Sequence, residues 1–280
     1  AEQDHSWEPM ATHLKEAGDM CLEAMLALKC HDAEGAYAKV AEALAVDPSD
    51  MFAHSLGAAA AYRRLRLDGG PKWFQAVWDH GLAIRRDTRY AHLALWLMAK
   101  ASLLTDRVLE ARRLLALLVE AAPDCVEGRA LLAALLRRCG EREQAAVQRR
   151  LLYGSLWGEW FGYFESVLAA EGEAAPRPCQ PCERFQASSF AAHRAELPIE
   201  HLLLYWECGL LDDAKRLLND AWLRANGVET SPVFGLLCAA AGADEAAGQI
   251  VKGAEWAVLS RWEDEALLRT ALEGARAGDA

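Results

Sequence analysis

The sequence predicts an all-α protein, and three observations support this prediction. Alanine recurs in stretches with helical apolar spacing, and a small or apolar residue follows each time seven positions later: Ala36 and Ala43, Ala76 and Ala83, Ala111 and Leu118, Ala145 and Leu152. Ala111 and Ala145 are 34 residues apart, a period typical of stacked helix pairs. Leu, Ala, Glu and Arg dominate the composition, without alternating runs of β-branched residues. We therefore expect a right-handed α-α superhelix of stacked antiparallel helix pairs.

Four helix pairs are predicted between residues 17 and 152. The first pairs residues 17–29 with 36–48 and closes at Pro48. The second starts at Met51, and an insertion over 66–72 is expected to lengthen the turn between its helices. The third starts at His92 and closes at Pro123. The fourth starts at Val126 and has no closing proline. These starting and closing residues follow from the same alanine spacing.

The first of these pairs resembles a tetratricopeptide repeat. Small residues stand at the positions where the two helices of that family cross closely, namely Ala24, Ala36 and Ala43, and Pro48 stands at the position of the family's closing proline. Small side chains let two helices approach each other. The resemblance covers residues 17–152 and, with fewer matching positions, about 195–260. It implies a solenoid of helix–turn–helix units that binds other proteins.

The second half of the chain is less regular. An aromatic-rich helix is expected over 157–170, and three prolines between residues 176 and 181 exclude a continuous helix there. Helices are expected again over 198–208 and 211–225, with Asp212 as an N-cap. A looser pair over 232–259 and a covering helix over 263–275 follow. This pattern predicts three parts: an N-terminal lobe over 1–168, a Pro/Cys linker over 169–187 and an acidic C-terminal lobe over 188–280.

Charge and hydropathy exclude several classes of function. The formal net charge of −11 argues against a general nucleic-acid binder, which needs a cationic face. No uncharged apolar run reaches the roughly 18 residues needed to cross a bilayer. Most of the eight cysteines stand at apolar helical positions, where a thiol acts as a small hydrophobe. We therefore expect a cytoplasmic location, with a periplasmic or secreted one as the alternative.

Cys179 and Cys182 form the sharpest candidate for chemistry. Their spacing matches a redox pair or one half of a zinc site. A redox pair would be expected to follow a strand and open a helix, whereas a proline-rich loop precedes this one. His193 and His201 are the candidate further zinc ligands, but their spacing matches no known zinc module. The interpretation we favour is two thiols in a loop, with no cofactor.

A basic and aromatic groove is the candidate binding site. In tetratricopeptide repeats the concave surface is lined mainly by the first helix of each pair. Transferred position by position, the resemblance implies Tyr62, Arg63, Trp96, Lys100, Arg137 and Arg138 as groove residues. Such a groove would suit an extended acidic peptide or a C-terminal carboxylate. The helix dipole alone also favours arginine near the end of a helix, so the arginine positions have two explanations.

The function expected from these observations is a non-catalytic scaffold or adaptor. It would hold a peptide segment of a partner protein, with no nucleic-acid partner. Two alternatives stay open at this point. One is a structural protein that assembles through its repeats, and the other is a metal-binding or redox protein that uses Cys179 and Cys182.

Overall fold

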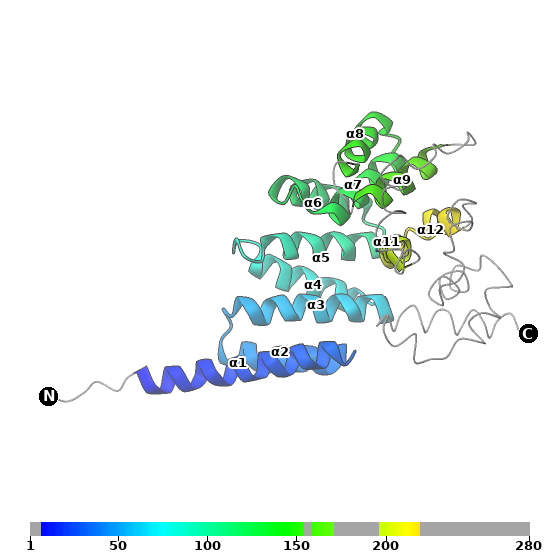
Figure 1. Cartoon of the computed structure of the whole chain (residues 1–280). Helices are drawn as coiled ribbons and strands as arrows, with labels where there is room; N and C mark the ends of the chain where they lie inside the picture. The colour runs from blue at the N-terminus through cyan, green and yellow to red at the C-terminus, as the bar shows by residue number, and fades with distance from the viewer. Residues whose placement is uncertain (1–6, 154–157, 171–195, 219–280) are drawn as a thin grey trace, which may run out of the picture. The chain divides into compact units, whose positions relative to one another are not determined.

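The computed structural model describes residues 7–153, 158–170 and 196–218, and these residues form α-helices joined by short turns, without a strand (Figure 1). The prediction of an all-α protein is confirmed for these ranges. The chain divides into two compact units, Ala1–Ala122 and Pro123–Ala280. The lobe boundary expected at residue 168 stays a prediction. Each unit is described by itself below.

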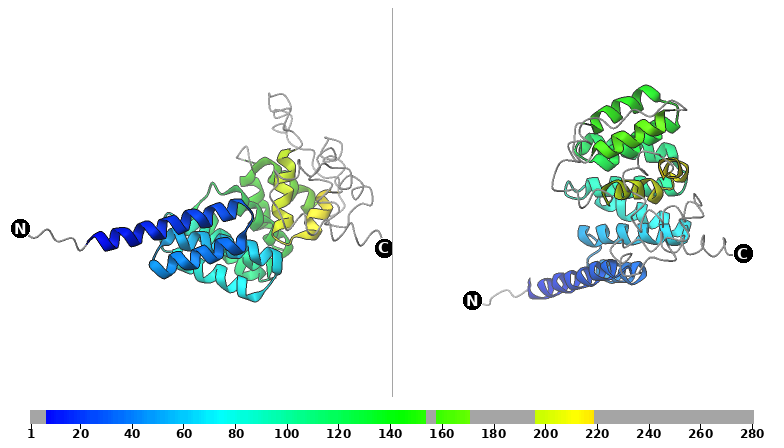
Figure 2. Two further views of the ribbon diagram at one scale, coloured as in Figure 1. Left: turned by 90° about the horizontal axis from the view of Figure 1, so that it is seen from below. Right: turned by 45° about the vertical axis from the view of Figure 1, so that its right-hand side comes forward.

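The first unit contains six described helices. They are α1 (Trp7–Lys29), α2 (Ala33–Val46), α3 (Met51–Asp68), α4 (Pro71–Ile84), α5 (Ala91–Leu104) and α6 (Val108–Ala121). Each helix packs antiparallel against the next one in the chain, and α1 and α2 lie side by side in every view of Figures 1 and 2. The contacts of α3 with both α1 and α5 add a second layer of packing between alternate helices. The predicted sequential helix pairs are therefore present in this unit.

Local residue chemistry sets the helix boundaries. Asp32 caps α2 by accepting a hydrogen bond of 2.7 Å from the backbone N–H of Gly35. α3 ends at Gly69, whose φ of 65° is in the left-handed region that glycine tolerates best. Pro71 then opens α4 after only two intervening residues, at a helix start where its missing N–H is not needed. The insertion over 66–72 therefore does not lengthen the turn as expected, because the longer helix α3 contains the first part of it and α4 starts within it.

Alanines form much of the interface between the helices of the first unit. Ala24, Ala36 and Ala43 are fully buried in one cluster with Val40 and Cys21. The corresponding alanines of the later pairs, Ala58, Ala99 and Ala111, are also fully buried, whereas Ala83 is half-buried. Because small side chains let helices approach each other, these buried alanines favour close helix packing.

The second unit contains five described helices. They are α7 (Val126–Arg138), α8 (Arg142–Leu152), α9 (Gly158–Ala169), α11 (Glu196–Glu207) and α12 (Leu211–Leu218). α7 and α8 form a pair, α9 packs against both, and α9 also contacts α11 and α12. Asp212, expected to be an N-cap, lies instead inside the first turn of α12, one residue past the helix start.

Aromatic side chains fill the space between α9 and α11. Phe161, Phe164 and Tyr205 are all buried, and Tyr205 is one of the largest fully buried side chains of the described chain. The ring centroids of Phe164 and Tyr205 are 6.3 Å apart in an edge-on arrangement, and those of Phe161 and Tyr205 are 6.4 Å apart. The aromatic cluster predicted over 157–170 is thus partly a core feature.

Several predicted features lie outside the described residues. They are most of the linker over 169–187, the continuation of α12 to residue 225, the helix pair over 232–259 and the covering helix over 263–275. Among the described helices, none combines the length and the apolar character that crossing a bilayer requires.

Candidate functional site

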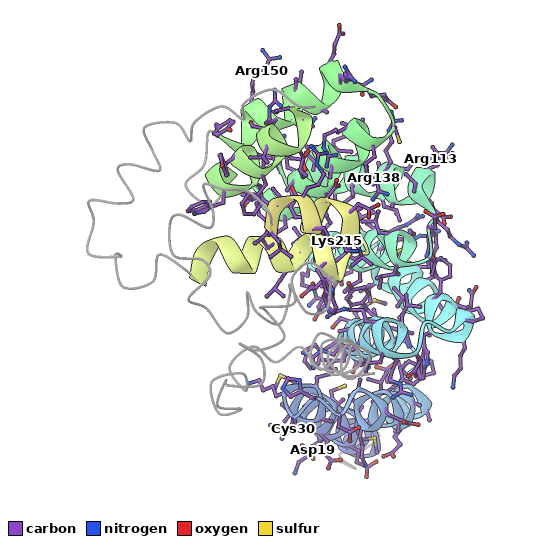
Figure 3. The ribbon with its side chains drawn as sticks, turned by 90° about the vertical axis from the view of Figure 1, so that its right-hand side faces the viewer. Asp19, Cys30, Arg113, Arg138, Arg150 and Lys215 are labelled. Carbon is purple, nitrogen blue, oxygen red and sulfur yellow. The ribbon has the colours of Figure 1, made fainter. Side chains whose placement is uncertain are left out.

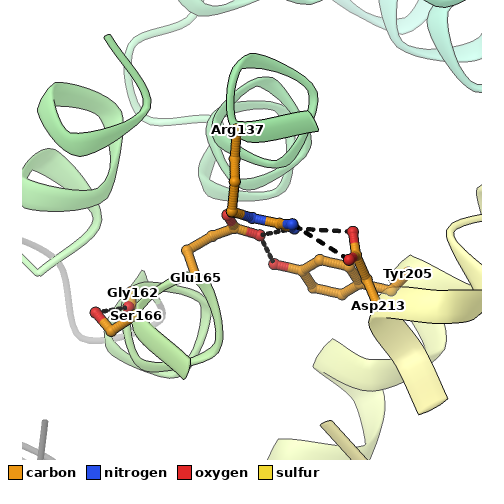
Figure 4. Close-up of polar contacts among 6 residues, drawn as sticks. All are labelled: Arg137, Gly162, Glu165, Ser166, Tyr205 and Asp213. Atoms are coloured by element: carbon orange, nitrogen blue, oxygen red, sulfur yellow. Dashed lines mark hydrogen bonds and ion pairs between the residues drawn. The ribbon is translucent and has the colours of Figure 1, made fainter. Parts of the chain in front are cut away.

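A buried ion-pair network joins four helices of the second unit. Arg137 of α7 lies between Glu165 of α9 and Asp213 of α12 (Figure 4). Its Nε donates to Glu165 Oε2 at 3.0 Å, and its Nη2 donates to Asp213 Oδ2 at 2.8 Å. Tyr205 of α11 donates its hydroxyl hydrogen to Glu165 Oε1 at 2.7 Å. The guanidinium therefore bridges two carboxylates, and the tyrosine satisfies a further acceptor of Glu165.

The charged groups of this network are buried, and burying a charge costs free energy unless the charge is paired. The side chains of Arg137, Glu165 and Asp213 are 14%, 2% and 8% exposed. Burial raises the pKa of Glu165 above its usual value, although the positive charge of Arg137 and the hydrogen bonds from Arg137 and Tyr205 oppose that rise. Burial alone would lower the pKa of Arg137, but the two carboxylates raise it well above its usual value. Arg137 is thus a cation whose charge is already compensated inside the unit.

A pocket of about 660 Å³ opens beside the network. Its walls come from α7, α8, α9 and α12, and five of the lining residues are arginines: Arg137, Arg138, Arg142, Arg149 and Arg216. Arg138, which Figure 3 labels, is exposed, as are Arg142 and Arg216, while Arg149 is half-buried. Short side chains, including Ala145, Ala146 and Ala169, make up part of the wall.

The pocket has more cationic than anionic groups. Its described lining has five arginines and one carboxylate, Glu165, which binds Arg137. The other carboxylate that binds Arg137, Asp213, is not among the lining residues. Within the described ranges, no carboxylate is paired with Arg138, Arg149 or Arg216. Guanidinium groups at such a site attract anions and form paired hydrogen bonds with carboxylate or phosphate oxygens. The arrangement can therefore attract an anion.

Four of the six groove residues expected from sequence lie in the first unit, and three of these four come together. The Lys100 ammonium lies over two rings, 4.5 Å from the Tyr62 centroid and 5.1 Å from the Trp96 centroid. Lys100 and Tyr62 are only 8% and 5% exposed. Arg63 donates to the carbonyl oxygen of Leu28, near the end of α1. These cations make contacts inside the unit, and whether they also contact a ligand stays a prediction.

The other two groove residues lie in the second unit. Arg138 is exposed and lines the pocket, whereas Arg137 also lines it but is held by the ion-pair network. Sequence reasoning missed Arg142, Arg149 and Arg216. A signal was present for two of them, since Arg142 and Arg149 are seven residues apart in one helix and so lie on one face. Glu165, an acid that directly follows the aromatic residues Tyr163 and Phe164, was a signal for the buried network.

Most of the candidate metal ligands lie outside the described residues. Cys179, Cys182 and His193 lie outside the described residues, and His201 lies in α11 with a side chain that is not described. Among the side chains that the structure does describe, no group of three or more His, Cys, Asp or Glu residues is placed to hold a metal ion.

Comparison of the sequence with models of known protein families gives no match. Comparison with curated proteins gives no match either.

Proposed function

We propose that the protein is a non-catalytic scaffold that binds an acidic peptide segment of a partner protein. The proposed architecture is a right-handed superhelix of the tetratricopeptide-repeat type. Three features support this architecture: the antiparallel packing of successive helices, the contacts between alternate helices and the buried alanines at the crossings. Chains of this type generally expose extended surfaces for binding other proteins.

The arginine-lined pocket is the observation that carries the proposal. It presents four arginines besides the compensated Arg137, in a protein whose formal net charge is −11. A cationic site on an anionic protein favours negatively charged segments, and Glu165, the one carboxylate among the described lining residues, is bound to Arg137. A volume of about 660 Å³ is in the range of pockets that bury several ligand groups.

A peptide-binding measurement tests the proposal. Two fluorescein-labelled peptides of equal length, one rich in Glu and one with Gln at the same places, are titrated with the full chain while fluorescence anisotropy is recorded. We expect the Glu peptide to bind more tightly, and its affinity to fall as salt rises above about 0.15 M, because added ions screen exposed charges.

Variants connect this binding to the pocket. Arg138→Ala combined with Arg149→Ala is expected to weaken binding of the Glu peptide at least tenfold, since each loses a charge-assisted hydrogen bond. Arg150→Ala is the matched control, because Arg150 is exposed, lies on the same helix and does not line the pocket (labelled in Figure 3). Equal affinities for the Glu and Gln peptides, or equal losses in both variants, would contradict the proposal.

A further inference from the structure

We propose that the arginine-lined pocket of the second unit is a receptor for a phosphorylated serine or threonine side chain of a protein segment. This inference rests on the proposed function, since it specifies which acidic group of a bound peptide the pocket selects. Four steps lead to it: the kind of cation, the number of cations, their distribution over helices and the pairing of the nearby acids with Arg137.

The first step is the kind of cation. All five cationic side chains that the described residues contribute to the pocket are arginines. A guanidinium presents several N–H donors in a fixed plane and binds two oxygens of one anion at once, whereas an ammonium acts as a point charge. Lys215, the neighbour of Arg216 on α12, does not line the pocket. The selection of arginine therefore favours oxyanions that offer several acceptors.

The second step is the number of cations. A carboxylate carries one negative charge on two oxygens and is satisfied by a single arginine, as the pairing of Arg137 with Asp213 in this unit illustrates. A phosphate monoester carries a charge of about −1.5 to −2 at neutral pH and three strong acceptor oxygens. Arg138, Arg149 and Arg216 together exceed what one carboxylate uses and match the three acceptor oxygens of a phosphate.

The third step is where the arginines come from. Arg138 is on α7, Arg142 and Arg149 are on α8, and Arg216 is on α12. Donors that come from three helices can approach one group from different directions, which suits a tetrahedral anion better than a planar one. The helix dipole also explains cations in a last turn, where Arg138, Arg149 and Arg216 stand. The dipole accounts for a cation at each of these three helix ends, but not for the position of all three ends at one pocket.

The fourth step concerns the acids beside the pocket. Glu165 lines the pocket, and Asp213 neighbours it through Arg137. Both would repel a dianion if their charges were uncompensated. Arg137 binds both carboxylates, and Tyr205 donates to Glu165 as well. Arg137 is thus a positioning residue for this site, and Arg138, Arg149 and Arg216 are left to bind phosphate.

The test compares four labelled peptides that differ only at one central residue. That residue is serine, phosphoserine, glutamate or phosphothreonine, in an otherwise uncharged sequence, and the full chain is titrated into each one. We expect the two phosphopeptides to bind at least tenfold more tightly than the glutamate peptide, and the serine peptide not to bind. Arg138→Gln, Arg149→Gln and Arg216→Gln are each expected to weaken phosphopeptide binding about tenfold, with Arg150→Gln as the unaffected control.

Dependence on pH provides a second readout that belongs to the phosphate itself. The second pKa of a phosphate monoester is about 6, so phosphopeptide binding is expected to weaken between about pH 7.5 and pH 5.5 as the ligand takes up a proton. Circular dichroism of each variant at both pH values shows whether the fold is kept. Binding that does not change over this interval would contradict recognition of the dianion.

The outcomes separate this inference from the proposed function. If Glu-rich peptides bind in the pocket but a single phosphoserine gives no advantage over glutamate, the phosphate inference is wrong and the scaffold proposal stands. If no peptide of either kind binds, both are wrong. Tighter binding of phosphatidic acid vesicles or of a single-stranded RNA oligonucleotide than of the phosphopeptides would also overturn the inference, because the phosphate would then come from a lipid or a nucleic acid.

Discussion

Two histidines of the first unit are in direct contact, and their hydrogen bonds determine where the protons lie. His54 Nε2 lies 3.1 Å from the carbonyl oxygen of Pro48, which can only accept, so this nitrogen carries a hydrogen. His54 Nδ1 lies 2.9 Å from His80 Nδ1. With both rings neutral, His54 Nδ1 accepts and His80 Nδ1 donates. The pair connects α3 to α4 and to the turn before α3.

This geometry predicts a loss of stability in mild acid. Burial first, and then the neighbouring His54, lower the pKa of His80 to about 4, although Asp79 acts in the opposite direction. In the unfolded chain a histidine has a pKa of about 6.5. As the pH falls from 6.5 towards 4, the unfolded state takes up a proton that the folded state does not. The stabilisation is therefore complete above pH 6.5 and decreases below it, by about 1–2 kcal/mol.

Urea unfolding at about pH 7.5 and about pH 5.5 measures this effect. The decrease in the free energy of unfolding is expected to be smaller in a His80→Gln variant than in the natural chain. His92→Gln is the control, because His92 is exposed. If the His80→Gln variant loses as much stability between the two pH values as the natural chain, the histidine pair is not the cause.

Gly57 provides the space that His80 occupies. A Cβ placed on Gly57 would lie 2.7 Å from both Cε1 and Nε2 of His80, far closer than carbon atoms normally approach. Gly57→Ala is therefore expected to lower the free energy of unfolding by about 1–3 kcal/mol through overpacking, despite the better helix propensity of alanine.

Gly18 of α1 is the matched control for this substitution. It is an exposed helical glycine, and in the described part of the chain a Cβ there would meet no other atom within 4 Å. Gly18→Ala is expected to stabilise the protein by up to about 1 kcal/mol. Thermal unfolding of both variants should thus shift in opposite directions, and a shift in the same direction would disprove the packing argument.

At the scale of single helices, Asp50 determines the start of α3. Its Oδ1 accepts hydrogen bonds from the backbone N–H groups of Phe52 at 2.8 Å and Ala53 at 3.1 Å. Its Oδ2 accepts a contact of 3.7 Å from the Cys21 thiol of α1. Burial, followed by the charge and the hydrogen bond of Asp50, raises the pKa of Cys21 to about 11, so this thiol stays protonated at neutral pH.

Removing the carboxylate should weaken α3. Asp50→Ala is expected to cost about 1–2 kcal/mol of stability, because two N–H groups lose their acceptor. Asp50→Asn should cost much less, since asparagine caps helices about as well as aspartate. Equilibrium denaturation of the two variants distinguishes capping from charge. Equal losses in both would assign the effect to the negative charge instead.

Helices and their pairing were predictable because their causes are local in the sequence. Ala36 and Ala43 are seven residues apart and both are fully buried, so the spacing alone identified the buried stripe of α2. Pro48 correctly indicated the end of that helix, which is Val46. The insertion over 66–72 was misread because sequence spacing does not distinguish a longer turn from longer helices. Gly69 and Gly70 were the signal that the turn stays short.

At the scale of the second unit, the site depends on partners that are far apart in the sequence. Arg137 is separated by 28 residues from Glu165 and by 76 from Asp213. No helical period relates such positions, so sequence could place Arg137 and Arg138 on a surface but could not show which of them was neutralised. The sequence resemblance treated these two arginines alike. The structure distinguishes them, since Arg137 makes the ion pairs and Arg138 faces the pocket.

The network also predicts how the second unit responds to the loss of one charge. Glu165→Gln keeps the shape of the side chain but leaves Arg137 with one carboxylate in a buried place. Breaking a buried ion pair from one side costs about 3–5 kcal/mol, because the remaining charge is uncompensated. Since Glu165 and its partners belong to α7, α9, α11 and α12, we expect these helices to become less stable together.

Hydrogen exchange followed by mass spectrometry localises this effect. Peptides from α7, α9, α11 and α12 should exchange faster in Glu165→Gln than in the natural chain, while the first unit serves as the internal reference. A variant in which Arg137→Met, Glu165→Leu and Asp213→Leu are combined removes every charge of the network. It should recover part of the lost protection, because apolar side chains of similar volume often replace a buried ion pair without loss. Faster exchange confined to α9 would show instead that Glu165 stabilises only its own helix, and the role of Arg137 in joining the four helices would have to be abandoned.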